Sequence, residues 1–275
     1  MVIKARAMKG RKVNSNFRAG AILALLIGGI TLAGLFYPYD YNAMDSGKRF
    51  SPPGSGRLLG TDNFGRDVFS RIMAGAKYTL LTALLTVAGS AAAGSALGML
   101  SGFAGGIWDE ITMRLMDALS SFPGILLALV MVSLMDNSHT TLIIALLILF
   151  IPSFTRIMRS GMLQYKGRDF VLTALIAGTP RLRIVFVHIF PNLVPSLLSA
   201  SVLGLSNAIL AESTMSYLGL GIQPPVPSWG RMLSESQSFL FNAPWCALAP
   251  GIMIMLTVLA FHYLGEGLRE WTGRE

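Results

Sequence analysis

Long apolar runs alternate with short polar connections along most of the chain. A helix needs about 20 mainly apolar residues to cross the hydrocarbon core of a bilayer. Runs of this kind predict six membrane-spanning helices, at about residues 19–37, 78–102, 118–135, 140–155, 192–211 and 244–264. The pattern therefore predicts an all-α, polytopic membrane protein.

The composition supports this class and excludes an ordinary soluble domain. The 275 residues are 53% hydrophobic and 13% charged, with a mean hydropathy of +0.59, whereas soluble domains carry about a quarter charged residues. A net charge of +8 is compatible with nucleic-acid binding only if basic residues gather on a polar surface. Here they interrupt apolar runs, so no nucleic-acid partner is expected. The single cysteine, Cys246, excludes a disulfide framework and a cysteine-based zinc site.

The first 18 residues form a basic leader that contains no acidic residue. A secretory signal peptide starts in this way, but the apolar stretch that follows is too long, and Tyr37-Pro38-Tyr39 is a poor cleavage site. We therefore predict an uncleaved signal anchor with a cytoplasmic N-terminus. Alternation through six spans then places roughly twice as many Lys and Arg residues inside as outside, in agreement with the positive-inside rule. The tail, residues 267–275, is also cytoplasmic in this arrangement.

The first outer loop, residues 38–77, begins with a Pro/Gly/Ser-rich portion and ends in a segment with helical periodicity. Thr61 or Asp62 is a suitable helix cap. Apolar residues then recur every four positions, which predicts an interfacial amphipathic helix before the second span. A packing connector and a substrate-contacting element both fit this pattern. The apolar face consists of Phe64, Val68, Ile72 and Ala76.

Small residues and prolines mark how the spans are expected to pack. Small side chains at four-residue spacing let a second helix approach closely in lipid. The prolines lie in or at the ends of four spans and indicate bent helices around a pathway. The small residues are Ser90, Gly94, Gly98, Gly102 and Gly106, and the prolines are Pro123, Pro152, Pro195 and Pro250.

The sequence carries no recognisable catalytic motif. It contains no G-x-x-x-x-G-K-[ST] loop, no H-E-x-x-H and no G-x-S-x-G. Acidic residues near the membrane fall at predicted span ends, where headgroups or a neighbouring Arg can satisfy them, so no proton relay is expected. These acidic residues are Asp117, Asp136, Glu212 and Glu266, and the scattered histidines are His139, His188 and His262.

The longest predicted cytoplasmic loop covers residues 156–191. Residues 167–177 read as a short helix, Gly178 as its left-handed stop, and Thr179 and Pro180 as the cap and first turn of a second helix that ends near Phe190. Docking to a soluble partner and lying on the membrane surface both fit this amphipathic pair. The side chains available to a partner groove are Leu172, Leu175 and Ile176.

The pattern Ala174-x3-Gly178-x9-His188-x2-Pro191 resembles the coupling-loop signature of the membrane subunits of binding-protein-dependent ABC importers, usually written E-A-A-x3-G. Within this superfamily the chain resembles the second permease subunit of dipeptide, oligopeptide and nickel importers. The resemblance implies a type I ABC importer transmembrane domain over residues 78–266. Further matching stretches are residues 59–71, 113–123, 212–225, 227–231 and 265–270.

One departure from the family pattern concerns the contact with the ATPase. The family usually has Glu-Ala where this sequence has Leu172-Thr173, so apolar burial of Leu172 is expected to replace the charge-assisted contact. The resemblance implies a coupling site composed of Leu172, Thr173, Ala174, Leu175, Gly178, Thr179, Pro180, His188 and Pro191.

The resemblance also implies a set of partners in the bacterial inner membrane. These are a second, similar permease, two cytoplasmic ATPase subunits, an extracytoplasmic binding protein and membrane lipid. ATP and Mg are used by the ATPase subunits, so this chain is expected to bind no cofactor and to be non-catalytic. ATP binding would drag the loop around Gly178 and open the pathway outward. Peptides are the first expectation for the cargo, with nickel or another small solute as alternatives.

The segment 219–230 between the last two spans is expected to shape the outer gate or a dock for the binding protein. A re-entrant packing loop fits equally, with Trp229 as an interfacial anchor. The residues expected in the gate are Gly219, Gly221, Pro224, Pro225 and Trp229.

Two other functions remain as alternatives to the importer permease. An ion-coupled secondary transporter would take up cargo without an ATPase and would need acidic residues embedded in the membrane. A structural or assembly membrane protein would leave transport intact when Gly178 is changed.

Overall fold

The computed structural model describes residues 17–25, 28–29, 38–54, 56–135 and 138–272, and this part is helical, with only two isolated β-bridges. The predicted all-α class is therefore confirmed. Of the first predicted span, residues 19–25 and 28–29 are helical, and the remainder lies outside the described residues. The longer helices are α2 (Val68–Ala104), α3 (Gly106–Ser121), α4 (Gly124–Leu134), α5 (His139–Lys166), α8 (Phe190–Tyr217) and α10 (Trp245–Thr272).

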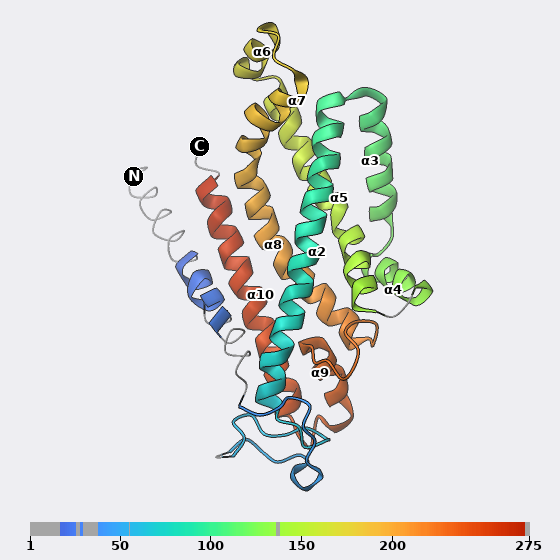
Figure 1. The fold of residues 1–275 in the computed structure, drawn as a ribbon, viewed down its shortest axis with the longest axis vertical. Coiled ribbons are helices and arrows are strands. Elements are labelled where there is room, and N and C mark those ends of the chain that lie inside the picture. The colour runs from blue at the N-terminus through green and yellow to red at the C-terminus, as the bar shows by residue number, and fades with distance from the viewer. Residues whose placement is uncertain (1–16, 26–27, 30–37, 55, 136–137, 273–275) are drawn as a thin grey trace, which may run out of the picture.

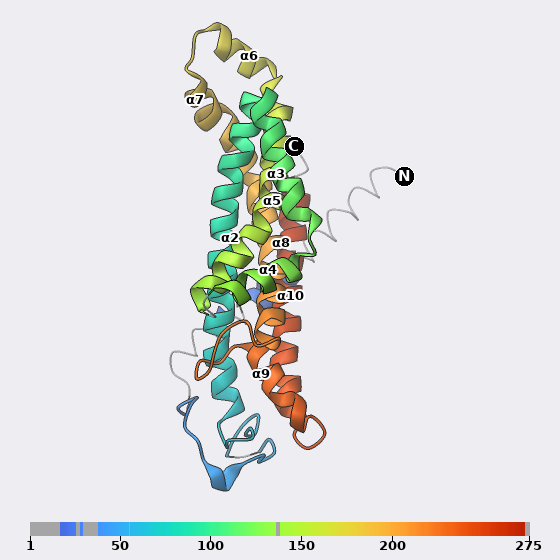
Figure 2. The same ribbon diagram turned by 90° about the vertical axis from the view of Figure 1, so that its right-hand side faces the viewer.

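The helices α2, α5, α8 and α10 run lengthwise beside one another and form the bundle (Figures 1 and 2). Four helices of the described chain are long and apolar enough to span a membrane, and the bent pair of α3 and α4 provides a fifth span if it counts as one. With 37 residues, α2 is about 55 Å long, whereas a bilayer core is about 30 Å thick. It therefore extends beyond the membrane.

The two ends of the bundle carry different elements (Figure 1). Beyond one end lie α6 (Asp169–Ile176) and α7 (Arg181–Arg183), and we call this the α6 end. At the other end lie α9 (Trp229–Ser236) and residues 38–67, which include the short η1 (Ser46–Lys48), and we call this the α9 end. The short η3 (Gln237–Phe239) follows α9 directly.

The predicted third span, residues 118–135, is not a single helix. The end of α3 at Ser121 and the start of α4 at Gly124 enclose a bend of 87°. Pro123 supplies the reason, because a proline disfavours helical backbone at the residue before it, and Phe122 is accordingly extended. The expectation that Pro123 marks a bent helix is therefore confirmed, whereas hydropathy alone gave one straight span.

Small residues of α2 bring this helix close to α5, as predicted. A Cβ added to Gly94 would lie 2.6 Å from Cβ of Phe154, and one added to Gly102 would lie 2.8 Å from Cβ of Met162. On the same stripe, Ser90 donates a hydrogen bond across the interface to the carbonyl of Leu147, at 2.9 Å. Gly106 does not belong to the stripe, because it starts α3 in open space with a φ of +60°.

The prediction of an amphipathic helix before the second span is wrong. Residues 60–67 are not helical, and α2 starts at Val68, with the Asp67 carboxylate as its N-cap, which accepts from the Ser70 amide at 2.8 Å. The proposed cap Asp62 instead accepts from the amides of Phe64 and Arg66 within a turn. The periodic positions Val68, Ile72 and Ala76 are buried in the first turns of α2, whereas Phe64 is 44% exposed.

We predict that Gly98→Ala weakens the bundle. The new methyl group would meet backbone atoms of α5, the carbonyl oxygen of Thr155 and the amide of Arg159, which cannot rotate away. Overpacking of this kind costs about 1–3 kcal/mol, which lowers the thermal unfolding midpoint of the detergent-purified protein.

Gly75→Ala is the matched control on the same helix. Its added methyl would lie at ordinary contact distances of 3.4–3.5 Å from Trp229 and Ser228, and alanine gains up to about 1 kcal/mol of helix propensity. Equal unfolding midpoints for the two variants would contradict the close packing of α2 and α5.

Candidate functional site

The predicted coupling loop projects beyond the α6 end of the bundle (Figures 1 and 2). It is shorter than predicted, because residues 156–166 continue α5 up to Lys166. The α6–α7 loop, defined here as residues 167–183, contains α6, a turn and α7. The predicted first helix, residues 167–177, corresponds to α6.

Gly178 ends α6 in the left-handed conformation that the sequence predicts. Its φ is +77°, and a Cβ at this position would meet nothing within 4 Å. The amide of Gly178 donates to the carbonyl of Leu175 and the amide of Thr179 to that of Ala174, both at 3.0 Å. This pair of bonds is a Schellman motif, in which glycine avoids the strain that a side chain would bring.

The second predicted helix differs from the prediction in two respects. Pro180, not Thr179, occupies the N-cap of α7, with no side-chain capping bond. The helix does not stop near Phe190, because a π-helical turn, η2 (Ile184–Ile189), joins α7 to α8, so that Arg181–Tyr217 is continuous. Pro191 lacks an amide hydrogen, and the Phe190 amide before it bonds to the carbonyl of Val185, five residues back.

We call this continuous helix, residues 181–217, the rod. Two predicted coupling residues therefore lie inside the rod and not in a free loop. His188 belongs to η2 and Pro191 to the first turn of α8. The other predicted coupling residues stay together in α6 and in the turn that follows it. These residues are Leu172, Thr173, Ala174, Leu175, Gly178, Thr179 and Pro180.

One face of α6 is anchored to the bundle and the other is exposed. Val171 is fully buried in an apolar cluster, whereas Leu172 is 45% and Ile176 88% exposed. Exposed apolar side chains next to a buried anchor give α6 a fixed surface for a partner. The cluster around Val171 contains Met99, Met158, Met162, Ile184, Val185, Ile189 and Leu193.

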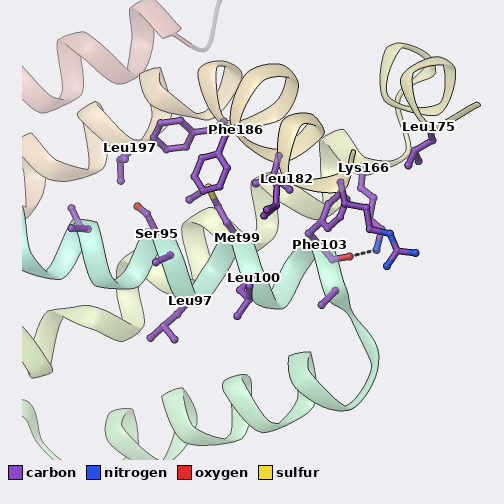
Figure 3. A pocket seen from close by; sticks show the side chains of 17 residues that line it. Ser95, Leu97, Met99, Leu100, Phe103, Lys166, Leu175, Leu182, Phe186 and Leu197 are labelled. Atoms are coloured by element: carbon purple, nitrogen blue, oxygen red, sulfur yellow. Dashed lines mark hydrogen bonds between the residues drawn. The ribbon is translucent and has the colours of Figure 1, made fainter. Parts of the chain in front are cut away.

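A groove of about 820 Å³ separates this rod from α2 near the α6 end (Figure 3). Leu100 and Phe103 of α2 form one wall, and Leu182 and Phe186 form the other. Lys166 lies at the groove and donates to the carbonyl of Phe103 at 2.6 Å. Beside the groove, Met99 of α2 still shares a buried cluster with Val185 and Ile189 of the rod. Farther along, Val87 of α2 and Ile209 of α8 lie in a second buried cluster.

At the α9 end, four buried or half-buried charges join residues 62–71 to α9. The Arg66 guanidinium binds Asp62 at 2.6 Å and Glu235 at 3.1 Å, and Arg71 binds the same Glu235 oxygen at 3.1 Å. The sequence prediction missed this network, because Glu235 is 164 residues from Arg71 and no local spacing marks the pair.

Glu212 forms a second buried polar centre at this end. It is fully buried and accepts hydrogen bonds from Ser216 at 2.7 Å and Ser213 at 3.4 Å, with Thr79 of α2 and Ser228 before α9 as further partners. The prediction that headgroups or an Arg satisfy Glu212 is therefore wrong. An acidic residue at the edge of a predicted span, such as Glu212, is the sequence signal that could have indicated this buried polar centre.

The other acidic residues near span ends have different surroundings. Asp117 binds Arg156 at 2.9 Å, as predicted for a neighbouring Arg. Glu266 lies 3.5 Å from His262 on α10. Asp136 lies outside the described residues.

The residues predicted for the outer gate divide between surface and interior. Pro224 and Pro225 are exposed, Gly219 is half-buried with a φ of +83°, and Gly221 is buried where a Cβ would collide with Ser216. Trp229 is fully buried and donates to the carbonyl of Ile72 at 3.0 Å. Because its ring is buried, Trp229 is not an interfacial anchor. Its hydrogen bond to Ile72 instead holds α9 against α2.

We predict that Glu235→Gln destabilises the α9 end. The change removes the charged partner that Arg66 and Arg71 share, while both guanidinium groups stay buried. The loss lowers the free energy of unfolding by about 3 kcal/mol. The thermal unfolding midpoint of the purified protein should fall by several degrees.

The control variant is Glu110→Gln, which breaks the exposed pair of Glu110 and Arg114 on α3. Exposed pairs contribute about 0–1 kcal/mol, so its midpoint should stay near that of the unchanged protein. A Glu235→Gln midpoint as high as that of the control would show that the network does not hold the loop.

Comparison with known proteins is consistent with this architecture. Residues 94–271 match the model of the family described as binding-protein-dependent transport system inner membrane component. The dipeptide transport system permease protein of Haemophilus influenzae is 37% identical over 266 residues, which cover 94% of this chain and 90% of the relative. The glutathione transport system permease protein of Pectobacterium atrosepticum is 38% identical, with 92% and 84% covered.

The di/tripeptide transport system permease protein of Pseudomonas aeruginosa is also similar, with 36% identity over 261 residues that cover 91% of this chain and 86% of the relative. The resemblance identified from the sequence motifs is thus confirmed over nearly the whole chain. The chain belongs to the family of binding-protein-dependent transport system inner membrane components.

Proposed function

We propose that this permease carries peptides across the bacterial inner membrane as one half of an ATP-driven importer. Its relatives are named as dipeptide, di/tripeptide and glutathione transport permeases, which favours peptides over nickel or another small solute. The remaining subunits are a second, similar permease, two cytoplasmic ATPase subunits and an extracytoplasmic binding protein. ATP and Mg are used by the ATPases, and this chain binds no cofactor and catalyses no reaction.

The α6–α7 loop is the contact with an ATPase subunit. The observation that carries this assignment is the pairing of an exposed apolar face, around Leu172 and Ile176, with a buried anchor at Val171. A partner that moves α6 pulls on the turn at Gly178 and, beyond it, on a helix that is continuous from Arg181 to Tyr217. Motion of the ATPases therefore reaches the membrane domain through one rod.

Charge supports a cytoplasmic position for the α6 end. Lys166, Arg168, Arg181 and Arg183 lie at or next to the α6–α7 loop, and basic residues favour the cytoplasmic side. The C-terminal end of α10 points the same way (Figure 1), so the C-terminus is cytoplasmic. The α9 end then faces the binding protein.

The α9 end provides a rigid outer surface. Trp229, Glu212 and the network around Glu235 fix the segment between α8 and α10, and Pro224 and Pro225 remain exposed on it. These two prolines form the dock for the binding protein, whereas Gly221 and Trp229 shape the gate from inside.

We predict that Gly178→Val uncouples ATP hydrolysis from transport. Valine at a positive φ costs about 1–2 kcal/mol and distorts the turn between α6 and α7. In the reconstituted complex, peptide-stimulated ATP hydrolysis and peptide uptake should both fall severalfold.

Gly178→Asn is the matched control, because asparagine tolerates the left-handed conformation and the site has room for a side chain. Its coupling should stay close to that of the unchanged complex. Uptake by the valine variant at the unchanged rate would contradict the coupling role and favour a non-transporting or differently driven protein.

We further predict that Leu172→Glu is tolerated. Leu172 is half exposed, so a carboxylate fits without burial in this chain, and the change restores the usual family residue. Assembly of the complex, measured by co-purification of the ATPase subunits, should be unchanged. Loss of the ATPases from the purified complex would show that the interface has adapted to an apolar contact.

A further inference from the structure

A cleft of about 430 Å³ with a mixed lining runs between α5 and α8. Its apolar residues include Phe150, Phe154 and Leu203. Its polar residues are Ser153 of α5, Ser196, Ser199 and Asn207 of α8, and Arg269 of α10. Ser153 lies near the middle of α5, and Asn207 lies well inside α8. Both helices are long and apolar enough to span the membrane, so the cleft reaches deep into the bilayer.

Three polar side chains of this cleft differ from the hydroxyls around them. Ser199 in the cleft, and Thr155 and Ser201 outside its lining, each donate to the carbonyl four residues earlier, as hydroxyls in apolar helices do. Within the described chain, no side-chain hydrogen bond is found for Ser153, Ser196 or Asn207, all of which are exposed. Unsatisfied polar groups are costly in lipid, so the surface that they form faces water or cargo.

An exposed ion pair continues this surface on α5. Arg156 binds Asp117 of α3 at 2.9 Å, and the two side chains are still 48% and 71% exposed. Ser153, Arg156 and Ser160 lie on one face of α5, because residues three, four and seven positions apart share a face. Arg156 and Asp117 lie near span ends, so this polar face of α5 runs from Ser153 toward the α6 end of the helix.

The chemistry of the lining suits amides. Serine hydroxyls and the Asn207 amide both donate and accept hydrogen bonds. Of the described residues that line the cleft, none is Asp, Glu, His or Cys. A bare divalent cation such as Ni²⁺ prefers imidazole, thiolate or carboxylate ligands, and this lining offers none of them.

The geometry points to this cleft as the part of the cargo passage that belongs to this subunit, in which Ser153, Ser196 and Asn207 hydrogen-bond to the backbone amides of a short peptide. The assignment rests on the proposed function, since it takes the chain as an importer permease. It adds the surface that the cargo touches and the chemical groups that recognise it.

The first test is cysteine accessibility in the assembled complex. Cys246 is the single native cysteine and is buried, so Cys246→Ser provides the background. Asn207→Cys is compared with Leu84→Cys, an exposed position of α2 outside the cleft. The probe is a negatively charged methanethiosulfonate reagent added to inside-out vesicles.

Asn207→Cys should react at least about ten times faster than Leu84→Cys, because a charged reagent reaches water-filled passages and not lipid-facing positions. Saturating trialanine should slow the reaction, whereas NiCl₂ should not. Equal reaction rates at the two positions would overturn the assignment, and so would a rate for Asn207→Cys that trialanine leaves unchanged.

The second test separates the passage from the rest of the function. Asn207→Leu should lower ATP-driven trialanine uptake about tenfold through the lost hydrogen bonds, with Asn207→Gln close to the unchanged complex. Both variants should assemble normally, since the side chain has no partner within the described chain. Unchanged uptake by Asn207→Leu would overturn the assignment. Absence of ATP-driven trialanine uptake in the unchanged complex would instead contradict the proposed function.

Discussion

The continuous helix from Arg181 to Tyr217 is the element on which the rest of the structure depends. One end of it carries the α6–α7 loop, its middle contributes Ser196 and Asn207 to the cleft between α5 and α8, and its far end holds the buried Glu212. A helix transmits displacement along its axis because each backbone hydrogen bond ties one turn to the next. The three functional regions are therefore connected by one continuous helix, and a displacement of this helix affects all three.

The surroundings of this rod are uneven along its length. Near the loop, a groove of about 820 Å³ lies between it and α2, although Met99 of α2 shares a buried cluster with Val185 and Ile189 of the rod. In the middle it packs against α2 and α5 around Val87 and Phe154, and at the α9 end hydroxyls of α2 and of the residue before α9 surround the Glu212 carboxylate. Packed interiors resist small deformations. Displacement at the loop is therefore expected to move the rod toward the groove, which is the free space beside it.

The sequence predicted those parts of the fold that depend on local or periodic signals. Hydropathy located four of the six predicted spans, in α2, α5, α8 and α10. The small residues of α2 indicated a close contact with another helix, and Gly178 marked the end of α6. These signals failed mainly where contacts between residues far apart in the sequence determine the structure. Hydropathy alone gave one span across the bend at Phe122–Pro123, although Pro123 itself indicated a bent helix. The periodicity from Phe64 to Ala76 indicated a helix that the Asp62 turn replaces up to Asp67. The bond between Arg71 and Glu235 spans 164 residues, so it became visible only in the folded chain.

The two ends differ in the way in which they are held, and this difference has a mechanical consequence. At the α9 end, buried charges and Trp229 fix the geometry, and breaking such contacts leaves uncompensated charge. At the α6 end, the loop is held by the apolar anchor at Val171 and by the backbone turn at Gly178, where an added Cβ would meet nothing within 4 Å. Displacement of the loop is therefore passed through this turn to the rod. The small loop displacement then appears as a change in the tilt of α8, along the wall of the cleft that contains Asn207.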